Sequence, residues 1–255
     1  MGTIITQRKL AVVPAYNEAD SVGNVVRSLQ AHAHEYDVLV VDDGSTDATM
    51  KVAMDAGARV LRLPFNLGIG GCVQSGFQYA LDNGYDFAVQ VDGDGQHDAR
   101  EIGQLERAMR DEQVDMVCGS RFLTADFQYP APISRKTGIN LFAFLLSRIV
   151  GQRVSDPTSG FRLYNRRGIA VFARDYPHDY PEVEAVLMVH WHRLRMCEVP
   201  VRMFSRNRGV SSINGSGKSA YYMIKVLLAI LVGLARKRPS VEPGDDAPVA
   251  AAHGI

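Results

Sequence analysis

The chain has 255 residues, of which 46% are hydrophobic and 22% are charged, enough for one large α/β domain with a substantial core. Its three cysteines lie far apart without a C-x-x-C pair, which argues against a disulfide framework or a zinc knuckle and suits a reducing compartment. The net charge is zero, yet residues 1–127 carry 10 Lys and Arg against 19 Asp and Glu, whereas residues 128–255 carry 18 against 9. We therefore expect the two halves to meet different partners.

Short apolar runs alternate with amphipathic segments after the N-terminus, whose first apolar run is too short for the core of a signal peptide. The runs predict strands at 10–13, 38–41, 59–63 and 87–91. The amphipathic segments predict helices at 19–31, 46–56 and 71–83. Repeated β-α units predict an α/β fold with a mostly parallel sheet between helices, whose ligands bind at the carboxyl ends of the strands.

The first two predicted strands end in polar turns. After the first come Pro14, Ala15, Tyr16, Asn17 and Glu18, where the turn and a helix starting at Ala19 would present backbone N–H groups and an aromatic ring to a nucleobase. After the second comes D-D-G-S-T-D, residues 42–47. Ser45 and Thr46 are ordinary N-cap residues and Asp47 suits a helix N-terminus. Asp43 is the surplus carboxylate, available to accept a hydrogen bond from a base or a ribose.

The third predicted strand leads into the glycine-rich turn N-L-G-I-G-G, residues 66–71. Val73 occupies the place of a third glycine, which argues against a dinucleotide-binding fingerprint, and the absence of G-K-[ST] excludes a P-loop. We expect a close turn near a phosphate or a sugar.

The fourth predicted strand ends in V-D-G-D-G-Q-H, residues 91–97. Asp92 and Asp94 on a tight turn can both direct oxygens at one hard cation, Mg²⁺ or Mn²⁺, and Gly93 and Gly95 let the backbone turn sharply. A cation held this way keeps positions for substrate phosphates, so a diphosphate is the natural partner. The alternative is an acidic turn that faces solvent.

Taken together, P-A-Y-N-E, V-D-D-G-S-T-D, N-L-G-I-G-G and V-D-G-D-G-Q-H resemble the family 2 glycosyltransferases of the GT-A fold. The resemblance covers about residues 10–213. It continues through G-S-R-F at 119–122, S-R at 134–135 and V-S-D-P-T-S-G-F-R at 154–162, which look like the branch that loads sugars onto polyprenyl phosphates, such as dolichyl-phosphate mannosyltransferases.

The resemblance implies roles for individual residues. It places the nucleotide sugar on Pro14, Ala15, Tyr16, Glu18, Asp43, Asp92 and Arg206, and the metal on Asp92, Asp94 and Gln96. Asp94, Arg121 and Arg135 are the implied catalytic residues, and both arginines are matched to the acceptor phosphate, for which a bidentate guanidinium is well suited. The alternative for either arginine is a surface charge or a helix-end salt bridge.

Arg202, Arg206 and Arg208 precede G-V-S-S-I, which resembles a loop that closes over the donor diphosphate. Ser212 departs from the lysine usual in mannosyltransferases, so GDP-mannose is not implied, and a UDP-linked sugar is the expected donor.

The expected reaction is an inverting transfer to polyprenyl (undecaprenyl) phosphate, whose anionic phosphate needs no strong base. Transfer to a sugar hydroxyl would need a carboxylate as general base. Asp156, Glu182 and Glu184 are the candidates, and each is better explained as structural.

We interpret the histidines of His190-Trp191-His192 as packing residues, because an i, i+2 pair is poorly placed on one helix face to share a metal.

Two apolar stretches, 139–150 and 221–235, bear on location. The second is shorter than the ~20 residues that cross a bilayer, and we expect neither to span. Each is either a core helix or a helix lying in the headgroup layer of the plasma membrane's inner leaflet, the second being followed by Arg236-Lys237-Arg238. The expected division is a catalytic domain at 1–215, a membrane-associating helix at 216–238 and a disordered tail at 239–255. A small integral membrane protein is an expected partner, a homo-oligomer is compatible with the sequence, and nucleic acid is not expected.

Two other functions compete with this one. A soluble family 2 enzyme acting on a saccharide, a protein or a small-molecule hydroxyl would make a water-soluble product. A non-catalytic nucleotide-sugar-binding subunit is disfavoured by the intact aspartates.

Overall fold

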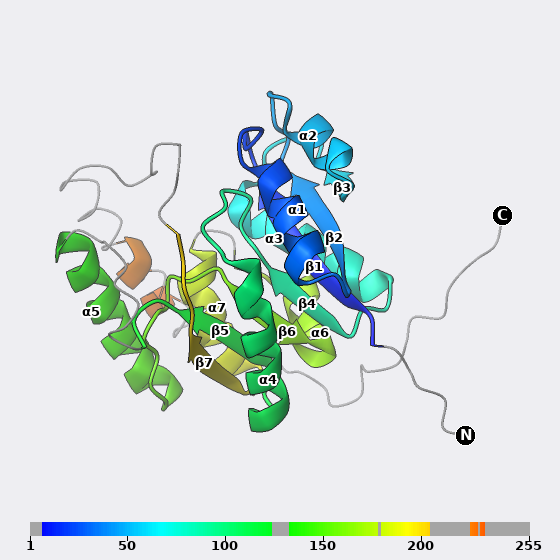
Figure 1. The fold of residues 1–255 in the computed structure, drawn as a ribbon. Helices are drawn as coiled ribbons and strands as arrows, with labels where there is room; N and C mark the ends of the chain where they lie inside the picture. The colour runs from blue at the N-terminus through cyan, green and yellow to red at the C-terminus, as the bar shows by residue number, and fades with distance from the viewer. Residues whose placement is uncertain (1–6, 124–132, 178–179, 205–224, 229, 233–255) are drawn as a thin grey trace, which may run out of the picture.

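The structure is a computed structural model that describes residues 7–123, 133–177, 180–204, 225–228 and 230–232, with the backbone alone for 133–137 (Figure 1). A seven-stranded sheet forms its centre, with the strand order β3-β2-β1-β4-β6-β5-β7. The strands are β1 (Lys9–Ala15), β2 (Tyr36–Asp42), β3 (Arg59–Arg62), β4 (Phe87–Gln90), β5 (Met116–Ser120), β6 (Arg162–Asn165) and β7 (Met196–Pro200). The helices are α1 (Val22–His32), α2 (Thr49–Asp55), α3 (Gly68–Asp82), α4 (Ile102–Glu112), α5 (Ile133–Val150), α6 (Arg166–Arg174) and α7 (Pro181–Trp191), with a 3₁₀ turn at Ala99–Glu101.

The sheet is mixed. All of its strand pairs are parallel except those of β6, which runs antiparallel to both β4 and β5. The order turns back at β1, which pairs with β2 on one side and β4 on the other. In a sheet of this kind the crevice at such a switch point, outside the carboxyl ends of the strands, is where ligands bind.

Alternation along the strands divides the core into two layers. Leu10 and Val12 of β1 face a layer built with α3, α6 and α7, whereas Ala11 and Val13 face a layer built with α1 and α4. Figure 1 shows α1 and α4 in front of the sheet, with α3, α6 and α7 behind it. Because both faces are covered, the central strands read as continuous apolar runs. The predicted α/β sheet with flanking helices is confirmed.

The predicted elements of the first half are all present, and their ends differ by a few residues. α1 begins at Val22 instead of Ala19, because residues 18–21 form a turn in which the N–H groups of Ser21 and Val22 both donate to the carbonyl of Glu18. α3 begins at Gly68, three residues before the predicted start. There the side chain of Asn66 accepts a hydrogen bond from the Gly68 N–H at 2.9 Å.

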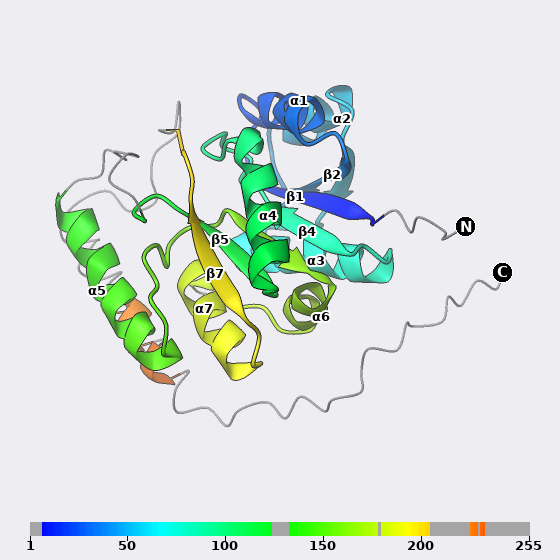
Figure 2. The same ribbon diagram turned by 60° about the horizontal axis from the view of Figure 1, so that its bottom comes forward.

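The apolar stretch at 139–150 lies within α5, which stands at one side of the molecule with the helical residues 225–228 and 230–232 beside it (Figures 1 and 2). Val226 and Ile230 are buried in the same core layer as Phe142 and Leu146 of α5. Within the part of the chain that the structure describes, no helix combines the length and the apolar character that crossing a bilayer requires.

Candidate active site

A pocket of about 320 Å³ lies at the carboxyl ends of β1, β2 and β4, at the switch point of the sheet. We call it the switch-point pocket. Its lining includes most of the residues to which the sequence assigned donor binding and both aspartates of the predicted metal site. The full lining is Pro14, Ala15, Tyr16, Glu18, Asp43, Asn66, Gly68, Ile69, Cys72, Asp92, Gly93 and Asp94. Four motifs that are far apart in the sequence therefore meet in one place.

The loop after β4 is held directly against the end of β1. The N–H of Gly93 donates to the carbonyl of Pro14 at 3.2 Å, and a Cβ on Gly93 would lie only 2.9 Å from that oxygen. Gly95 has a φ of +79°, so the predicted sharp turn is present there. Gly93 lies in the same turn, and it also allows the close approach to Pro14.

Asp92 and Asp94 both reach the switch-point pocket, and hard carboxylate oxygens suit Mg²⁺ or Mn²⁺. Among the residues that the structure describes, no group of three or more His, Cys, Asp or Glu side chains is placed to hold a metal. The pair fits a cation that takes its remaining ligands from substrate phosphates. Gln96, the predicted third ligand, directs its amide nitrogen to the carbonyl of Phe204 at 3.3 Å.

The loops after β1 and β2 are joined by side chains. Three successive N–H groups of the first loop donate to the second loop or to the start of α2: Asn17 to Ser45 Oγ at 2.9 Å, Glu18 to Thr49 Oγ1 at 2.8 Å and Ala19 to Asp47 Oδ2 at 3.2 Å. These N–H groups are therefore used within the protein, and the prediction that they face a nucleobase is wrong.

The predicted N-caps of α2 are also wrong. The N-cap residue is Ala48, whose side chain makes no capping bond, while Asp47 accepts a hydrogen bond from the Thr49 N–H at 2.9 Å. Ser45 and Thr46 instead take part in the link to the first loop, where the Thr46 N–H donates to the side chain of Asn17 at 2.9 Å. Asn17 has a left-handed φ of +54°, which asparagine tolerates better than most residues. This structural role of Asn17 was not predicted.

Asp43 links β2 to the turn before α3. Its Oδ1 accepts a hydrogen bond from the Leu67 N–H at 2.7 Å. Burial raises the pKa of the Asp43 carboxyl, and the N–H groups of Leu67 and Gly68 oppose that rise. Tyr16, on the wall of the pocket, is 46% exposed. An exposed ring beside a fixed carboxylate is a suitable surface for a base and a ribose.

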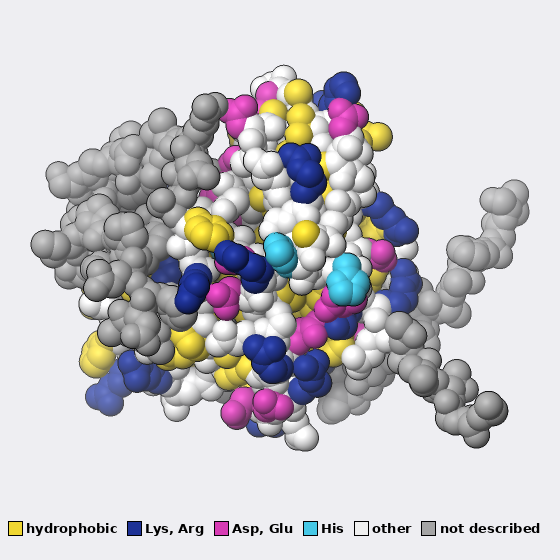
Figure 3. All heavy atoms as spheres, in the orientation of Figure 1, with side chains coloured by type: hydrophobic (Ala, Val, Ile, Leu, Met, Phe, Trp, Pro, Cys, Tyr) yellow, Lys and Arg dark blue, Asp and Glu magenta, His cyan; other side chains and the backbone are white. Residues whose placement is uncertain are grey.

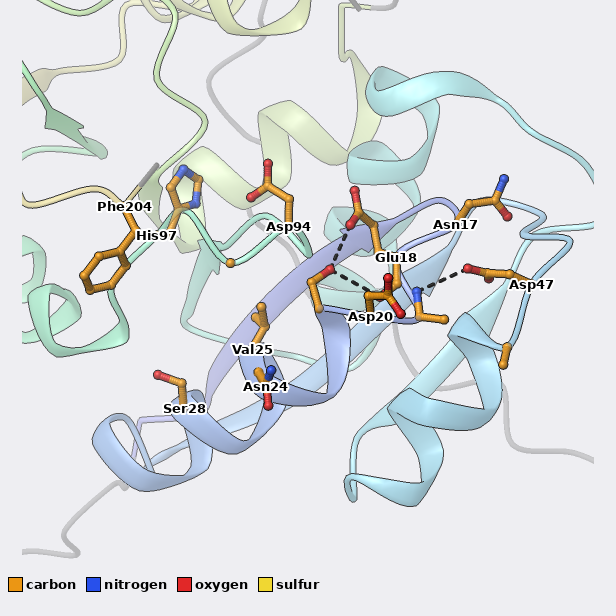
Figure 4. Close-up of a pocket in the computed structure, with 14 residues that line it drawn as sticks. Asn17, Glu18, Asp20, Asn24, Val25, Ser28, Asp47, Asp94, His97 and Phe204 are labelled. Carbon is orange, nitrogen blue, oxygen red and sulfur yellow. Dashed lines mark hydrogen bonds between the residues drawn. The ribbon is translucent and has the colours of Figure 1, made fainter. Parts of the chain in front are cut away.

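A second pocket of about 920 Å³ adjoins the first and shares Glu18 and Asp94 with it (Figure 4). The start of α1 and the loop before α2 form one part of its lining, and His97 and Phe204 form another. Backbone contacts bring the last of these residues to the aspartate loop: His97 forms an antiparallel bridge with Met203, and the Phe204 N–H donates to the Gln96 carbonyl at 2.8 Å. No local pattern in the sequence predicted this contact.

Arg121 lies just after β5, and its guanidinium is buried against Asp156. Its Nε donates to Asp156 Oδ2 at 2.7 Å, and its Nη2 donates to Asp156 Oδ1 and to Thr158 Oγ1, both at 2.8 Å. Asp156 is fully buried. Arg121 is thus neither of the predicted alternatives, a surface charge or a helix-end salt bridge, and it does not line either of the two pockets. Its match to the acceptor phosphate stays a prediction.

The other predicted arginines are less completely described. Arg135 lies in the first turn of α5, where the structure describes the backbone alone. Arg206 and Arg208, together with Ser212, lie outside the described residues. Arg202 is exposed just after β7.

The three candidate bases have different environments. Asp156 is paired with Arg121, and Glu184 accepts a hydrogen bond from the Tyr180 N–H at 3.2 Å at the start of α7, so both have structural roles. Glu182 is different: burial raises the pKa of its carboxyl, although its own backbone N–H and the charge of Arg162 oppose that rise. A raised pKa is what a general base near neutral pH needs.

The His190-Trp191-His192 motif forms the end of α7. His192 is buried with its Nε2 3.7 Å from a carboxylate oxygen of Asp175, Trp191 packs on the core, and His190 is exposed. The predicted packing role is therefore confirmed for His192 and wrong for His190.

Comparisons with known proteins agree with this geometry. The model of the family described as glycosyl transferase family 2 matches residues 10–172. The chain is 33% identical over 217 residues to an undecaprenyl-phosphate mannosyltransferase of Micrococcus luteus, covering 82% of this chain and 88% of the relative. It is 27% identical over 227 residues to a UDP-N-acetylglucosamine–dolichyl-phosphate N-acetylglucosaminyltransferase of Methanococcus voltae, covering 80% of this chain and 90% of the relative.

The fold also resembles solved structures. Glucosyl-3-phosphoglycerate synthase from Mycobacterium tuberculosis, in complex with Mn²⁺, UDP and glucosyl-3-phosphoglycerate, superposes with a TM-score of 0.68 at 20% identity. The match covers 91% of this chain and 81% of that one. At this identity the likeness supports the fold alone.

Proposed function

Because the chain belongs to the family 2 glycosyltransferases and is an enzyme of that class, we propose that it transfers a sugar from a UDP-linked donor to undecaprenyl phosphate, with inversion, at the inner face of the membrane. The observation that carries the proposal is the switch-point pocket, which collects Tyr16, Asp43 and the two aspartates after β4 on one surface.

The donor side follows from that pocket. Tyr16 and Asp43 hold the base and the ribose, and the turn at 66–69 closes the pocket on the other side. Asp92 and Asp94 would hold Mg²⁺ or Mn²⁺, which when bound neutralises charge on the leaving diphosphate. The Methanococcus voltae relative is named for a UDP-linked donor, which supports the same choice here.

The acceptor side is supported by the two relatives, both of which are named for a polyprenyl-type phosphate acceptor. A phosphate oxygen of the lipid attacks the anomeric carbon from the face opposite the diphosphate. The bond from that carbon to the diphosphate breaks, and UDP leaves with the bonding electrons. The acceptor is already an anion near neutral pH, so the enzyme needs no base to activate it. Arg121 and Arg135 are the proposed partners of its phosphate.

A membrane-facing surface accompanies this acceptor. Leu141 and Phe144 of α5 and Leu228, Leu231 and Val232 of the C-terminal helical residues are all exposed, between 41% and 61%. Arg148 lies over the ring of Phe144 at 5.8 Å. Figure 3 shows hydrophobic and basic side chains together on the α5 side of the molecule. Apolar side chains beside cations are the composition that places a helix in the headgroup layer.

The test is a product analysis. The purified protein is incubated with Mn²⁺, undecaprenyl phosphate and a panel of nucleotide sugars, and the chloroform-extractable product is identified by mass. We expect one lipid-linked sugar, formed from a UDP-linked donor.

Two results would contradict the proposal. A labelled sugar that appears only in a water-soluble product would identify the alternative enzyme, which acts on a hydroxyl. If only sugars linked to another nucleotide are consumed, the proposal of a UDP-linked donor is wrong, while the proposal of a lipid acceptor still stands.

A further inference from the structure

Gln90, the last residue of β4, directs a buried amide at Asp92. The two residues are two apart, so their side chains lie on the same face of the extended chain. Gln90 is 3% exposed, and its Nε2 donates to Asp92 Oδ1 at 3.2 Å. A buried amide is costly unless it is hydrogen-bonded, so this glutamine is best explained by the carboxylate that it contacts.

Gly160, in the loop before β6, fits closely against the same carboxylate. A Cβ on Gly160 would lie 3.0 Å from Gln90 Nε2 and 3.3 Å from each of the two carboxylate oxygens of Asp92. The backbone of Gly160 is therefore a wall of the space that Asp92 occupies. A side chain there would push either the amide or the carboxylate out of position.

The side chain of His97 contacts the backbone of Asp92. Its Nδ1 accepts a hydrogen bond from the Asp92 N–H at 3.0 Å, so a neutral ring carries its proton on Nε2. That Nε2 lies 3.6 Å from Asp92 Oδ2, which is longer than a hydrogen bond. The ring is stacked on Phe161 with 4.9 Å between centroids. It is therefore fixed from one side by packing and from the other by Asp92.

We propose that Gln90, Gly160 and His97 are positioning residues that fix the Asp92 carboxylate for the metal and the donor diphosphate. The inference rests on the proposed function, because it concerns the same site. Partners that orient a metal-binding carboxylate commonly change metal affinity by about 10- to 100-fold when they are removed. Asp94 is oriented differently, through the Gln96 N–H, which donates to its Oδ1 at 3.0 Å. The two aspartates thus depend on separate supports.

The test measures Mn²⁺ binding in the presence of UDP, followed by the electron paramagnetic resonance signal of free Mn²⁺. Gln90→Leu keeps the volume of the side chain and removes the donor, and we expect about tenfold weaker Mn²⁺ binding. The matched control is Gln74→Leu on α3, whose amide donates to the carbonyl of Ala173 at 3.2 Å, away from the site. It should bind Mn²⁺ as the wild type does. The thermal midpoints of both variants report any change in folding.

Two further variants test the contacts of Asp92 with Gly160 and His97. Gly160→Ala should weaken Mn²⁺ binding about tenfold, which keeps the test decisive if Gln90→Leu does not fold. His97→Asn keeps an acceptor near the position of Nδ1, so it should bind Mn²⁺ more tightly than His97→Ala does. A purely structural role for His97 would change the thermal midpoint and leave the two affinities equal.

The outcomes separate this inference from the function on which it rests. Wild-type affinity in both Gln90→Leu and Gly160→Ala, with binding lost in Asp94→Asn, would overturn the positioning role and leave the proposed function standing. A wild-type protein that binds no Mn²⁺ with UDP would overturn the metal dependence and, with it, this inference.

Discussion

The donor side and the acceptor side of this enzyme are built in different ways. Around the switch-point pocket, loops after three strands are tied to one another by hydrogen bonds between backbone N–H groups and side chains, as with Asn17 and Ser45 or Leu67 and Asp43. On the α5 side, Phe144 and Leu231 are exposed and offer apolar surface. If the proposed function is right, a small, polar donor is recognised by fixed geometry, whereas the proposed lipid acceptor is met by an apolar surface.

The charges follow the same division. The acidic residues that concentrate in the first half include Asp92 and Asp94, and the basic residues of the second half include Arg148 beside the apolar side chains of α5. The proposed cation site and the proposed membrane surface would therefore be contributed by opposite halves of the chain.

The largest expected effect comes from breaking the donor side. Asp94→Asn replaces a carboxylate that lines both pockets, and we expect release of UDP from the donor to fall by about 10²- to 10³-fold, because charge on the leaving group is no longer stabilised. Steady-state release of UDP measures it. Asp20→Asn, in the larger pocket only, is the control and should be unchanged. Full activity in Asp94→Asn would remove the catalytic assignment.

The next largest effect concerns the buried pair of Arg121 and Asp156. Arg121→Ala leaves the buried Asp156 carboxylate without its cation, and the free energy of unfolding should fall by about 3–5 kcal/mol. Denaturant unfolding measures it. Lys51→Ala, which breaks the exposed pair with Asp55, should have a much smaller effect. A raised KM for undecaprenyl phosphate in folded Arg121→Ala would show that the arginine serves the acceptor as well as the fold. A variant as stable as the wild type would show that the pair with Asp156 does not stabilise the fold.

A smaller effect is expected on the acceptor side. Phe144→Asp should weaken binding to anionic vesicles by roughly tenfold, because an apolar side chain no longer enters the headgroup layer. Co-sedimentation with vesicles measures it. Phe65→Asp is the matched control, because Phe65 is 64% exposed and Phe144 is 61% exposed, and Phe65 lies at the donor side. Equal losses in both variants would mean that α5 is not the membrane surface.

The smallest expected effect is that of Glu182→Gln, which distinguishes transfer to a phosphate from transfer to a hydroxyl. Glu182→Gln should leave the rate of transfer to undecaprenyl phosphate unchanged, because a phosphate anion needs no base. An enzyme that activates a hydroxyl through Glu182 would lose about 10²- to 10⁴-fold. The rate of sugar transfer to each acceptor class, with wild type and variant side by side, decides between them.

The parts of the molecule that the sequence predicted well are those with local signals. β1 to β4 and the helices between them follow from apolar periodicity, and the pocket residues follow from the polar turns at the strand ends, since parallel strands bring those ends together. The placement of Asp92 and Asp94 at the pocket and the turn at Gly95 also follow from local signals.

Contacts between distant segments left no local signal. The pairing of Arg121 with Asp156 and the bridge between His97 and Met203 depend on how the second half of the sheet is arranged. The roles of Ser45 and Thr46 were also not predictable from the local sequence. Both residues have the composition of N-cap residues, but the neighbouring loop uses their hydrogen-bonding groups instead.

The bridge between His97 and Met203 also sets how short a working fragment can be. The family match ends at residue 172, but a fragment cut there would lack α7, β7 and the two residues, Met203 and Phe204, that brace the aspartate loop. Expression boundaries placed before residue 204 should therefore yield protein whose aspartate loop is no longer held, even where the first four strands still fold.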